Sequence, residues 1–165
     1  MPTAKKAADI PKSSEATTAK PAKKAAAKQQ AKTIKYEDKS PGQPELLPIF
    51  DSLKMLLKPY VKGSLKAQEG TAGTYSVGVA EPVEILGKKR DLYFAGIMVQ
   101  KGYVGFYFFP IYTDPVIAKD LQPELLKCLK GKSCFHIKKN DPKLLQQVEQ
   151  ALEVGYNLYH EKGYV

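Results

Sequence analysis

The chain has 165 residues, a formal net charge of +9 and only two cysteines. This length fits a single domain with room for a core, and two cysteines exclude a disulfide framework. No apolar run approaches the roughly 20 residues of a membrane span, and Lys5 and Lys6 interrupt the apolar core that a signal peptide needs. We therefore expect a protein of the reducing cytoplasm that does not enter the membrane.

The positive charge is concentrated at the start of the chain. Residues 1–40 contain 10 lysines against four acidic residues, a net of +6, which leaves +3 for residues 41–165. Their Ala, Lys and Pro composition provides too little apolar surface to offset the entropy of ordering, so we predict a disordered tail. Such a composition resembles the tails of linker histones, and the tail lysines could hold nucleic acid without sequence preference, for example Lys20, Lys23, Lys24 and Lys28. The alternative is a solubilising extension with no specific partner.

Residues 41–165 are predicted to form the folded domain, which begins with an amphipathic helix. Pro48 suits the first turn of a helix, and apolar residues then recur at helical spacing as far as Tyr60. The polar, glycine-rich residues 61–74 are predicted to form a loop.

Strands are predicted next, over 74–80, 83–86, 91–99 and 103–109, joined by short turns. The segment Gly87–Arg90 reads as a hairpin turn with three cations at its tip. Consecutive strands with short turns favour an antiparallel meander. Alternation places Val104, Phe106 and Phe108 on one face, and Phe94 on the same face as Gly96 and Met98. Because both faces are apolar, we expect the second face to be covered in part.

The last third of the domain mixes helices with one strand. A helix over 124–130 is predicted to end at Gly131 as a left-handed cap, and a short strand is predicted over 133–138. Asp141 and Pro142 start a long amphipathic helix, in which Gly155 lies on the apolar face and suggests close backbone approach to the sheet. The fold class is therefore α+β, an antiparallel sheet packed against N- and C-terminal amphipathic helices.

Three stretches of the chain carry a family resemblance. The string GYVGFYFFPIYTDP, the string LQPELLKCLKGKSCFHIKK and the final helix ending in YHEKGYV resemble the YdhG-like family of small bacterial domains of unknown function. The resemblance covers roughly residues 45–165. The resemblance implies a frataxin-like fold. It also suggests iron chaperoning as a function, because some members are described as frataxin-like iron chaperones. It brings no catalytic residue.

The residues themselves suggest a binding site rather than an active site. We expect a ligand cleft between the aromatic strand and the Lys127–Lys139 segment, lined by Tyr107, Phe109, Tyr112, Lys132, His136 and Lys138. Cys134 and His136 lie two apart on one strand and could supply two metal ligands, but zinc and iron sites require three or four. Lys132 follows the predicted cap at Gly131 and could meet an anion, although lysines there also complement a helix dipole.

Three functional hypotheses follow from these features. The first is a non-enzymatic binding or chaperone-type module for a small ligand or a protein, with no resident cofactor. The second is an iron chaperone, which rests on the family resemblance alone; Lys54 and Lys58 dilute the acidic ridge that such a protein would present on its first helix. The third is nucleic-acid association through the basic tail.

Overall fold

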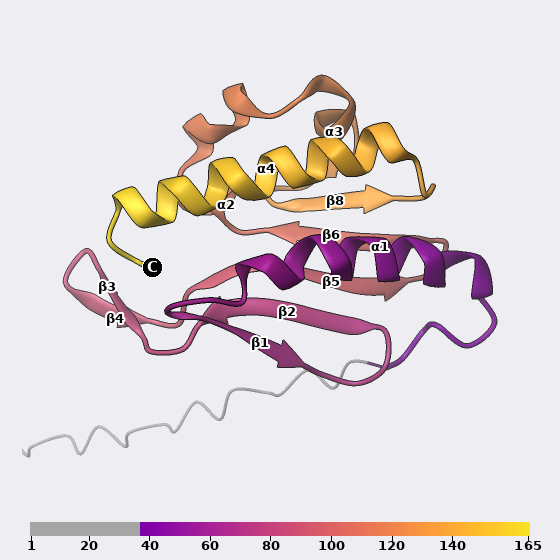
Figure 1. Cartoon of the computed structure of the whole chain (residues 1–165), viewed down its shortest axis with the longest axis horizontal. Coiled ribbons are helices and arrows are strands. Elements are labelled where there is room, and N and C mark those ends of the chain that lie inside the picture. Colours follow the sequence, from indigo (N-terminus) through magenta and orange to yellow (C-terminus); the bar gives the residue numbers. More distant parts are fainter. Residues whose placement is uncertain (1–36) are drawn as a thin grey trace, which may run out of the picture. The chain divides into compact units, whose positions relative to one another are not determined.

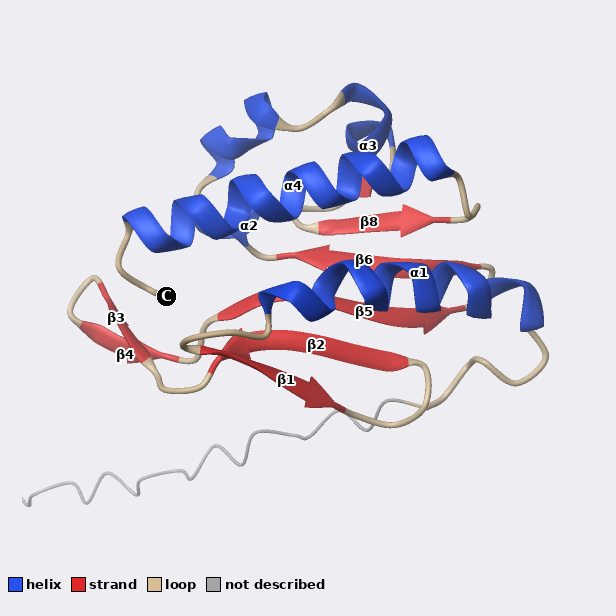
Figure 2. Cartoon of the chain, viewed as in Figure 1, coloured by secondary structure: helices blue, strands red, loops and turns tan. Residues whose placement is uncertain are grey.

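The computed structural model describes residues 37–165, which form an α+β fold around a six-stranded antiparallel sheet (Figures 1 and 2). The strand order is β1-β2-β5-β6-β8-β7. The strands are β1 (Leu65–Glu69), β2 (Thr74–Val79), β5 (Tyr93–Gln100), β6 (Tyr103–Phe108), β8 (Cys134–Ile137) and β7 (Leu129–Lys130). A separate two-stranded ribbon joins β3 (Val83–Ile85) to β4 (Lys88–Arg90). The predicted tail lysines lie outside the described residues.

Two long helices cover one face of this sheet (Figure 1). Helix α1 (Leu47–Leu57) continues into the short 3-10 helix η2 (Lys58–Tyr60), and α4 (Pro142–Glu161) begins where the Asp141 side chain accepts a hydrogen bond from the Lys143 N–H. The shorter helical segments are η1 (Pro44–Leu46), α2 (Pro110–Thr113), η3 (Pro115–Asp120) and α3 (Pro123–Lys127). Between residues 37 and 165, no helix has the length and apolarity that crossing a membrane requires.

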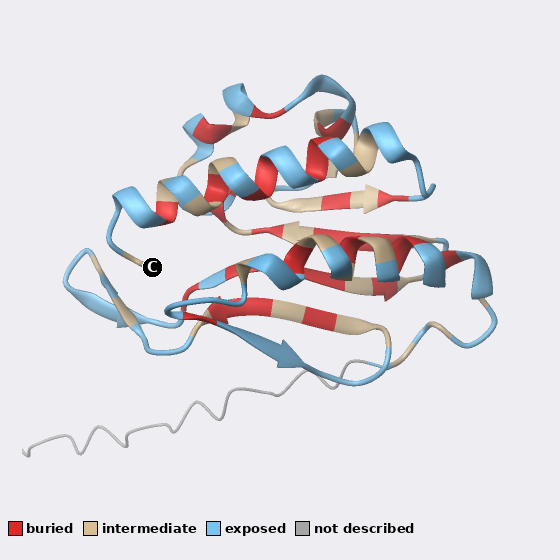
Figure 3. Cartoon of the chain, in the orientation of Figure 1, coloured by how far each residue is buried: buried red, intermediate tan, exposed pale blue. Residues whose placement is uncertain are grey.

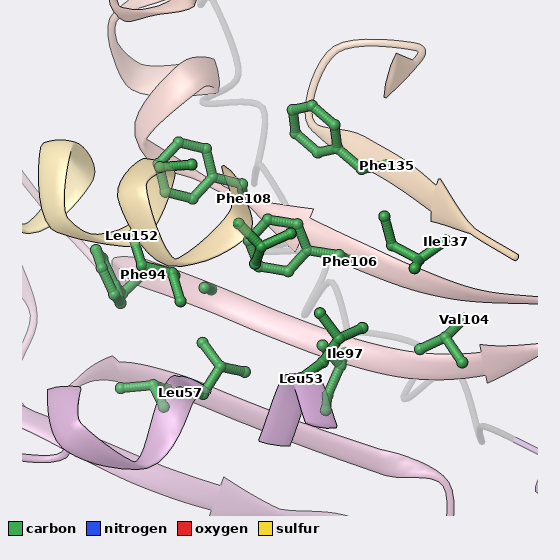
Figure 4. Close-up of a cluster of buried hydrophobic side chains, with 14 of the residues drawn as sticks. Leu53, Leu57, Phe94, Ile97, Val104, Phe106, Phe108, Phe135, Ile137 and Leu152 are labelled. Atoms are coloured by element: carbon green, nitrogen blue, oxygen red, sulfur yellow. The ribbon is translucent and has the colours of Figure 1, made fainter. Parts of the chain in front are cut away.

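The core lies between these helices and the sheet (Figures 3 and 4). Both helices are striped, with buried residues toward the strands and exposed residues outward, as the helical spacing of apolar positions predicts. Leu53 and Leu57 of α1 and Leu152 of α4 belong to the same buried cluster as Phe94, Ile97, Phe106 and Phe108 of the central strands (Figure 4). The predicted pairing of terminal amphipathic helices with an antiparallel sheet is therefore confirmed.

Gly155 allows α4 to approach the sheet closely. A Cβ atom at this position would lie 2.5 Å from Cζ of Phe108 and 2.8 Å from Cγ of Pro110. Real Cβ atoms do not approach other atoms so closely, so a side chain here would force the helix away from β6. The close approach expected from the sequence is confirmed.

The predicted loop over 61–74 is wrong, because it contains the edge strand β1. Leu65 to Glu69 pair with Val79 to Tyr75 of β2 along the whole strand. Only Leu65 is buried, and the next four residues are exposed. An exposed edge strand of this kind has no alternation of apolar and polar residues. The sequence pattern therefore could not predict that it pairs with β2.

The predicted hairpin turn at Gly87–Arg90 is also wrong in detail. Leu86 and Gly87 both have positive φ, 52° and 72°, and they form the two-residue turn. Lys88, Lys89 and Arg90 then form β4 and pair with β3. The three cations therefore lie along a strand rather than at a loop tip.

The helix predicted over 124–130 ends early. Helix α3 stops at Lys127, and Leu129 and Lys130 pair with β8 as the edge strand β7. Gly131 has the predicted positive φ of 75°, but it lies in the turn between β7 and β8. The idea that Lys132 complements a helix dipole behind a glycine cap is therefore wrong.

One bulge changes the faces assigned to β5. Val77 pairs with Ala95 while Gly78 pairs with Tyr93, so Phe94 is an extra residue opposite β2. Phe94 is fully buried and packs edge-on against Tyr159 of α4. Alternation had placed Phe94 with Gly96 and Met98, and that prediction is wrong because the bulge shifts the alternation by one residue.

Candidate ligand-binding face

The face of the sheet opposite α1 and α4 carries a separate set of side chains, which we call the open face. Cross-strand pairing places Ser76, Gly96, Tyr107 and Cys134 in one row, and Thr74, Met98, Gly105 and His136 in the next. Both long helices lie on the other side (Figure 1). The sequence had led us to expect partial cover, but no helix of residues 37–165 lies on this face.

An apolar groove of about 480 Å³ runs along the open face over β2 and β5. Tyr93 and Phe109 form one wall, with ring centroids 5.4 Å apart. Tyr93 is 42% exposed although it lies in a central strand. Ser76, Gly96 and Met98 line the groove beside them, together with Tyr107. We call this hollow the aromatic groove.

Two glycines keep the open face flat enough for a groove. A Cβ atom at Gly96 would lie 3.1 Å from Cβ of Ser76, and one at Gly105 would lie 3.0 Å from Cε2 of Tyr107. The Tyr107 ring therefore lies along its own strand above Gly105 rather than standing away from the sheet. Glycine inside a strand weakens it, but both glycines are buried, and a larger residue at either would collide with a neighbouring side chain.

Tyr107 and Cys134 form a hydrogen-bonded pair at the middle of the open face. Burial, together with the neighbouring Cys134, raises the pKa of Tyr107 to about 12. Burial also raises the pKa of the Cys134 thiol, and the hydrogen bond from Tyr107 offsets this only in part. A nucleophilic cysteine needs a lowered pKa, so the surroundings of Cys134 suit a structural thiol.

A second aromatic pair lies where the open face meets β8. The rings of Tyr103 and His136 are stacked, with centroids 3.8 Å apart and planes inclined by 15°. Burial lowers the pKa of His136, and the nearby Lys130 and Lys138 lower it further. Both effects favour the neutral form of the His136 ring, and Lys130 and Lys138 are close enough to act on it.

The six predicted cleft residues do not line a single hollow. Tyr107 and Phe109 belong to the aromatic groove. Tyr112 and Lys132 border a second hollow beside α2, where the Lys132 ammonium lies 5.7 Å from the Tyr112 ring. His136 and Lys138 border a third. The first and third hollows are separate because β6 and β8 lie between β5 and β7 in the sheet. The second lies beside α2 and η3.

The third hollow, which we call the basic hollow, has a volume of about 380 Å³ at the β7–β8 edge. Four lysines and one aspartate line it with His136: Lys127, Lys130, Lys138, Lys139 and Asp141. One of the lysines is already paired, because the Lys127 ammonium lies 2.8 Å from a Glu124 carboxylate oxygen. The remaining charge favours anions here.

The two weak metal candidates share a face but have different partners. Cys134 and His136 are separated by one residue of β8, as predicted, while Phe135 and Ile137 are buried in the core. The Cys134 side chain is hydrogen-bonded to Tyr107, whereas the His136 ring stacks on that of Tyr103. Among residues 37–165 there is no group of three or more His, Cys, Asp or Glu side chains placed to hold a metal ion.

Sequence reasoning missed most of the residues that line the aromatic groove, among them Ser76, Tyr93 and Met98. Tyr93 was placed opposite Met98 because alternation ignored the bulge at Phe94. A signal was available in the sequence, since the glycines at 78, 96 and 105 interrupt three strands that otherwise favour β structure.

Comparison of this chain with protein-family models, with curated proteins and with solved structures found no match.

Proposed function

We propose that this chain is a non-enzymatic binding module whose ligand lies in the aromatic groove of the open face. The observation that carries the proposal is a groove of about 480 Å³ walled by Tyr93 and Phe109 on a sheet face that neither long helix covers. Ligand sites are typically apolar hollows of this size with a few polar groups. Polar side chains that could orient a ligand line the groove, among them those of Gln68, Glu69, Thr74, Ser76 and Tyr93.

The finer fold assignment belongs to the same proposal. Two helices against one face of an antiparallel sheet is the arrangement that the resemblance to the YdhG-like family implies, and it supports a frataxin-like architecture. An iron chaperone would need a group of carboxylates. Asp51 and Glu45 are exposed near the start of α1, and Lys54 of that helix is paired with Glu69 at 3.2 Å. The aromatic groove therefore supports an organic ligand better than iron.

The proposal can be tested by titrating flat aromatic fragments into the 15N-labelled full chain. We expect a subset of fragments to shift the backbone amide resonances of Ser76, Gly96 and Met98 with dissociation constants below millimolar. Replacing Tyr93→Ala removes one wall, and the loss of a ring contact worth about 1 kcal/mol should weaken binding about fivefold.

Tyr112→Ala is the matched control, because Tyr112 is an exposed tyrosine (57%) outside the groove. It should leave fragment affinity unchanged. If no fragment shifts the groove amides, or if both variants weaken binding equally, the groove is not the binding site.

A further inference from the structure

The aromatic groove and the basic hollow lie on one continuous sheet. Lys130 pairs with Cys134, Cys134 with Tyr107, and Tyr107 with Gly96. Four neighbouring strands are therefore crossed, and at about 4.8 Å a strand the Cα atoms of Lys130 and Gly96 are about 14 Å apart. A ligand about 14 Å long or longer can therefore reach from the aromatic groove to Lys130.

Rings lie at both ends of this path, and cations lie at one end. Tyr93 and Phe109 stand at one end, and the Tyr103–His136 stack stands at the other. The lysines that act on His136, Lys130 and Lys138, lie beside that stack. Planar rings bind nucleobases by stacking, and lysines bind phosphates.

The open face also has the shape that stacking requires. Gly96 and Gly105 place no side chain above the two central strands, and the Tyr107 ring lies over Gly105. Sheets that display aromatic side chains from central strands are one of the recurring platforms for unpaired bases. Paired bases in a duplex present no free ring faces, so this surface favours single strands.

From these observations we propose that single-stranded nucleic acid binds across the open face, with bases on the two aromatic pairs and phosphates at Lys130 and Lys138. The occupant is chosen by charge, because Lys130 and Lys138 lie near the His136 ring and residues 41–165 carry a net charge of +3. The proposal rests on the proposed function, since it names a ligand class for the same face. It differs from binding by the tail lysines, because it assigns the bases to the folded domain.

The experiment uses the full chain and a labelled 15-nucleotide oligothymidylate, followed by fluorescence anisotropy at several salt concentrations. Lys130→Ala with Lys138→Ala should weaken binding and reduce the slope of log affinity against log salt by about 1.4, since each phosphate contact to a single strand contributes about 0.7. Tyr93→Ala should weaken binding about fivefold or more without changing that slope, because stacking of one base contributes about 1–3 kcal/mol.

The matched control removes two exposed lysines from the helical segments, Lys58→Ala with Lys119→Ala. The control changes the net charge by the same amount as the Lys130 and Lys138 double variant. If the open face binds the oligonucleotide, the control should have a smaller effect on affinity and on the salt slope. Equal effects of the two double variants would overturn the proposal, because attraction by net charge alone would then explain binding.

Changes in backbone amide resonances show where the oligonucleotide binds on the protein. We expect oligothymidylate to shift the backbone amide resonances of Gly96, Gly105 and His136. Comparing its affinity with that of oligouridylate shows whether the open face prefers DNA or RNA. Shifts confined to residues 1–36, equal binding of a duplex to the open face, or concentration-dependent shifts of the same amides without oligonucleotide would each overturn the proposal. The last result would indicate a second copy of the chain on this face.

The two proposals fail in distinguishable ways. If fragments shift Ser76 and Gly96 while oligonucleotides leave the open face unchanged, the groove remains a binding site and only the ligand class is wrong. If neither probe shifts these amides, both proposals are wrong.

Discussion

Tyr159 links the long C-terminal helix to the bulge that shapes the open face. Its side chain is completely buried, and its hydroxyl donates a 2.8 Å hydrogen bond to the backbone carbonyl of Tyr93. The bulge at Phe94 turns the Tyr93 side chain to the open face. One buried hydroxyl therefore helps to hold an exposed wall of the groove from the opposite side of the sheet.

Tyr159→Phe should lower the free energy of unfolding by about 1 kcal/mol, because the Tyr93 carbonyl loses its hydrogen-bond donor. Urea unfolding at pH 7 measures this loss. The matched control is Tyr112→Phe, which removes a hydroxyl from an exposed side chain and should leave stability unchanged.

The same substitution should alter the loss of stability in alkali. Burial raises the pKa of Tyr159 well above its ordinary value of 10.0, so the folded chain keeps a proton that the unfolded chain releases. The unfolded chain then binds fewer protons, and the free energy of unfolding falls as pH rises above 10. Tyr107, with a pKa of about 12, adds to this fall. Unfolding between pH 8 and pH 11 should show a shallower fall for Tyr159→Phe, and an unchanged slope would contradict the assignment.

Gly155 is the second residue whose effect can be measured alone. Gly155→Ala places a methyl group against Phe108 and Pro110, and overpacking of this kind costs about 1–3 kcal/mol despite the better helix propensity of alanine. Asn157→Ala, on the exposed side of the same helix, should change stability by no more than about 0.5 kcal/mol. Thermal unfolding of both variants compares the two positions, and a stabilised Gly155→Ala chain would show that α4 can move away from β6.

At the scale of elements, α4 is the helix that the sequence determines best. Asp141 caps it through a 3.0 Å hydrogen bond from the Lys143 N–H, and Pro142 occupies its first turn. Its apolar stripe repeats over 20 residues, which is long enough for periodicity to be unambiguous. Strands β1 and β7 are the opposite case, because each is short, lies at an edge and has few buried residues.

Asp141→Ala should remove the cap of α4 and lower the free energy of unfolding by about 1 kcal/mol. Asp141→Asn keeps a hydrogen-bond acceptor and should recover most of the loss, which makes it the matched control. Chemical denaturation followed by far-ultraviolet circular dichroism measures both. Equal losses in the two variants would indicate that the charge of Asp141, rather than its cap, is what stabilises the helix.

At the scale of the whole molecule, the core and the charge belong to different parts of the chain. The buried hydrophobic core of the described residues runs from Leu46 to Tyr159, whereas residues 1–40 carry +6 of the net charge. The described chain is already tied to the sheet before the predicted boundary at Pro41, because the Lys39 ammonium donates to the Gln100 side chain at 2.7 Å. The Gln43 side chain likewise accepts from the Gly102 N–H at 2.6 Å.

A chain of residues 37–165 should therefore unfold cooperatively, with the same free energy as the full chain within about 0.5 kcal/mol. Urea unfolding of both proteins at moderate salt tests this expectation. A chain of residues 44–165 loses the contacts of Lys39 and Gln43, and it should be slightly less stable than residues 37–165. Non-cooperative unfolding of residues 37–165 would show that the first 36 residues belong to the folded unit.

The sequence by itself determined the elements whose evidence is local. Helical spacing predicted α1 and α4, and alternation in β6 separated Phe106 and Phe108 from Tyr107. In each of these elements, the pattern of apolar residues within the element indicates which side is buried. Only the tertiary structure decided the rest. The edge strands exist through hydrogen bonds to distant partners, and the bulge at Phe94 depends on the pairing of β2 with β5. The open face exists because both helices pack on the same side of the sheet, a choice between two apolar faces that no single strand specifies.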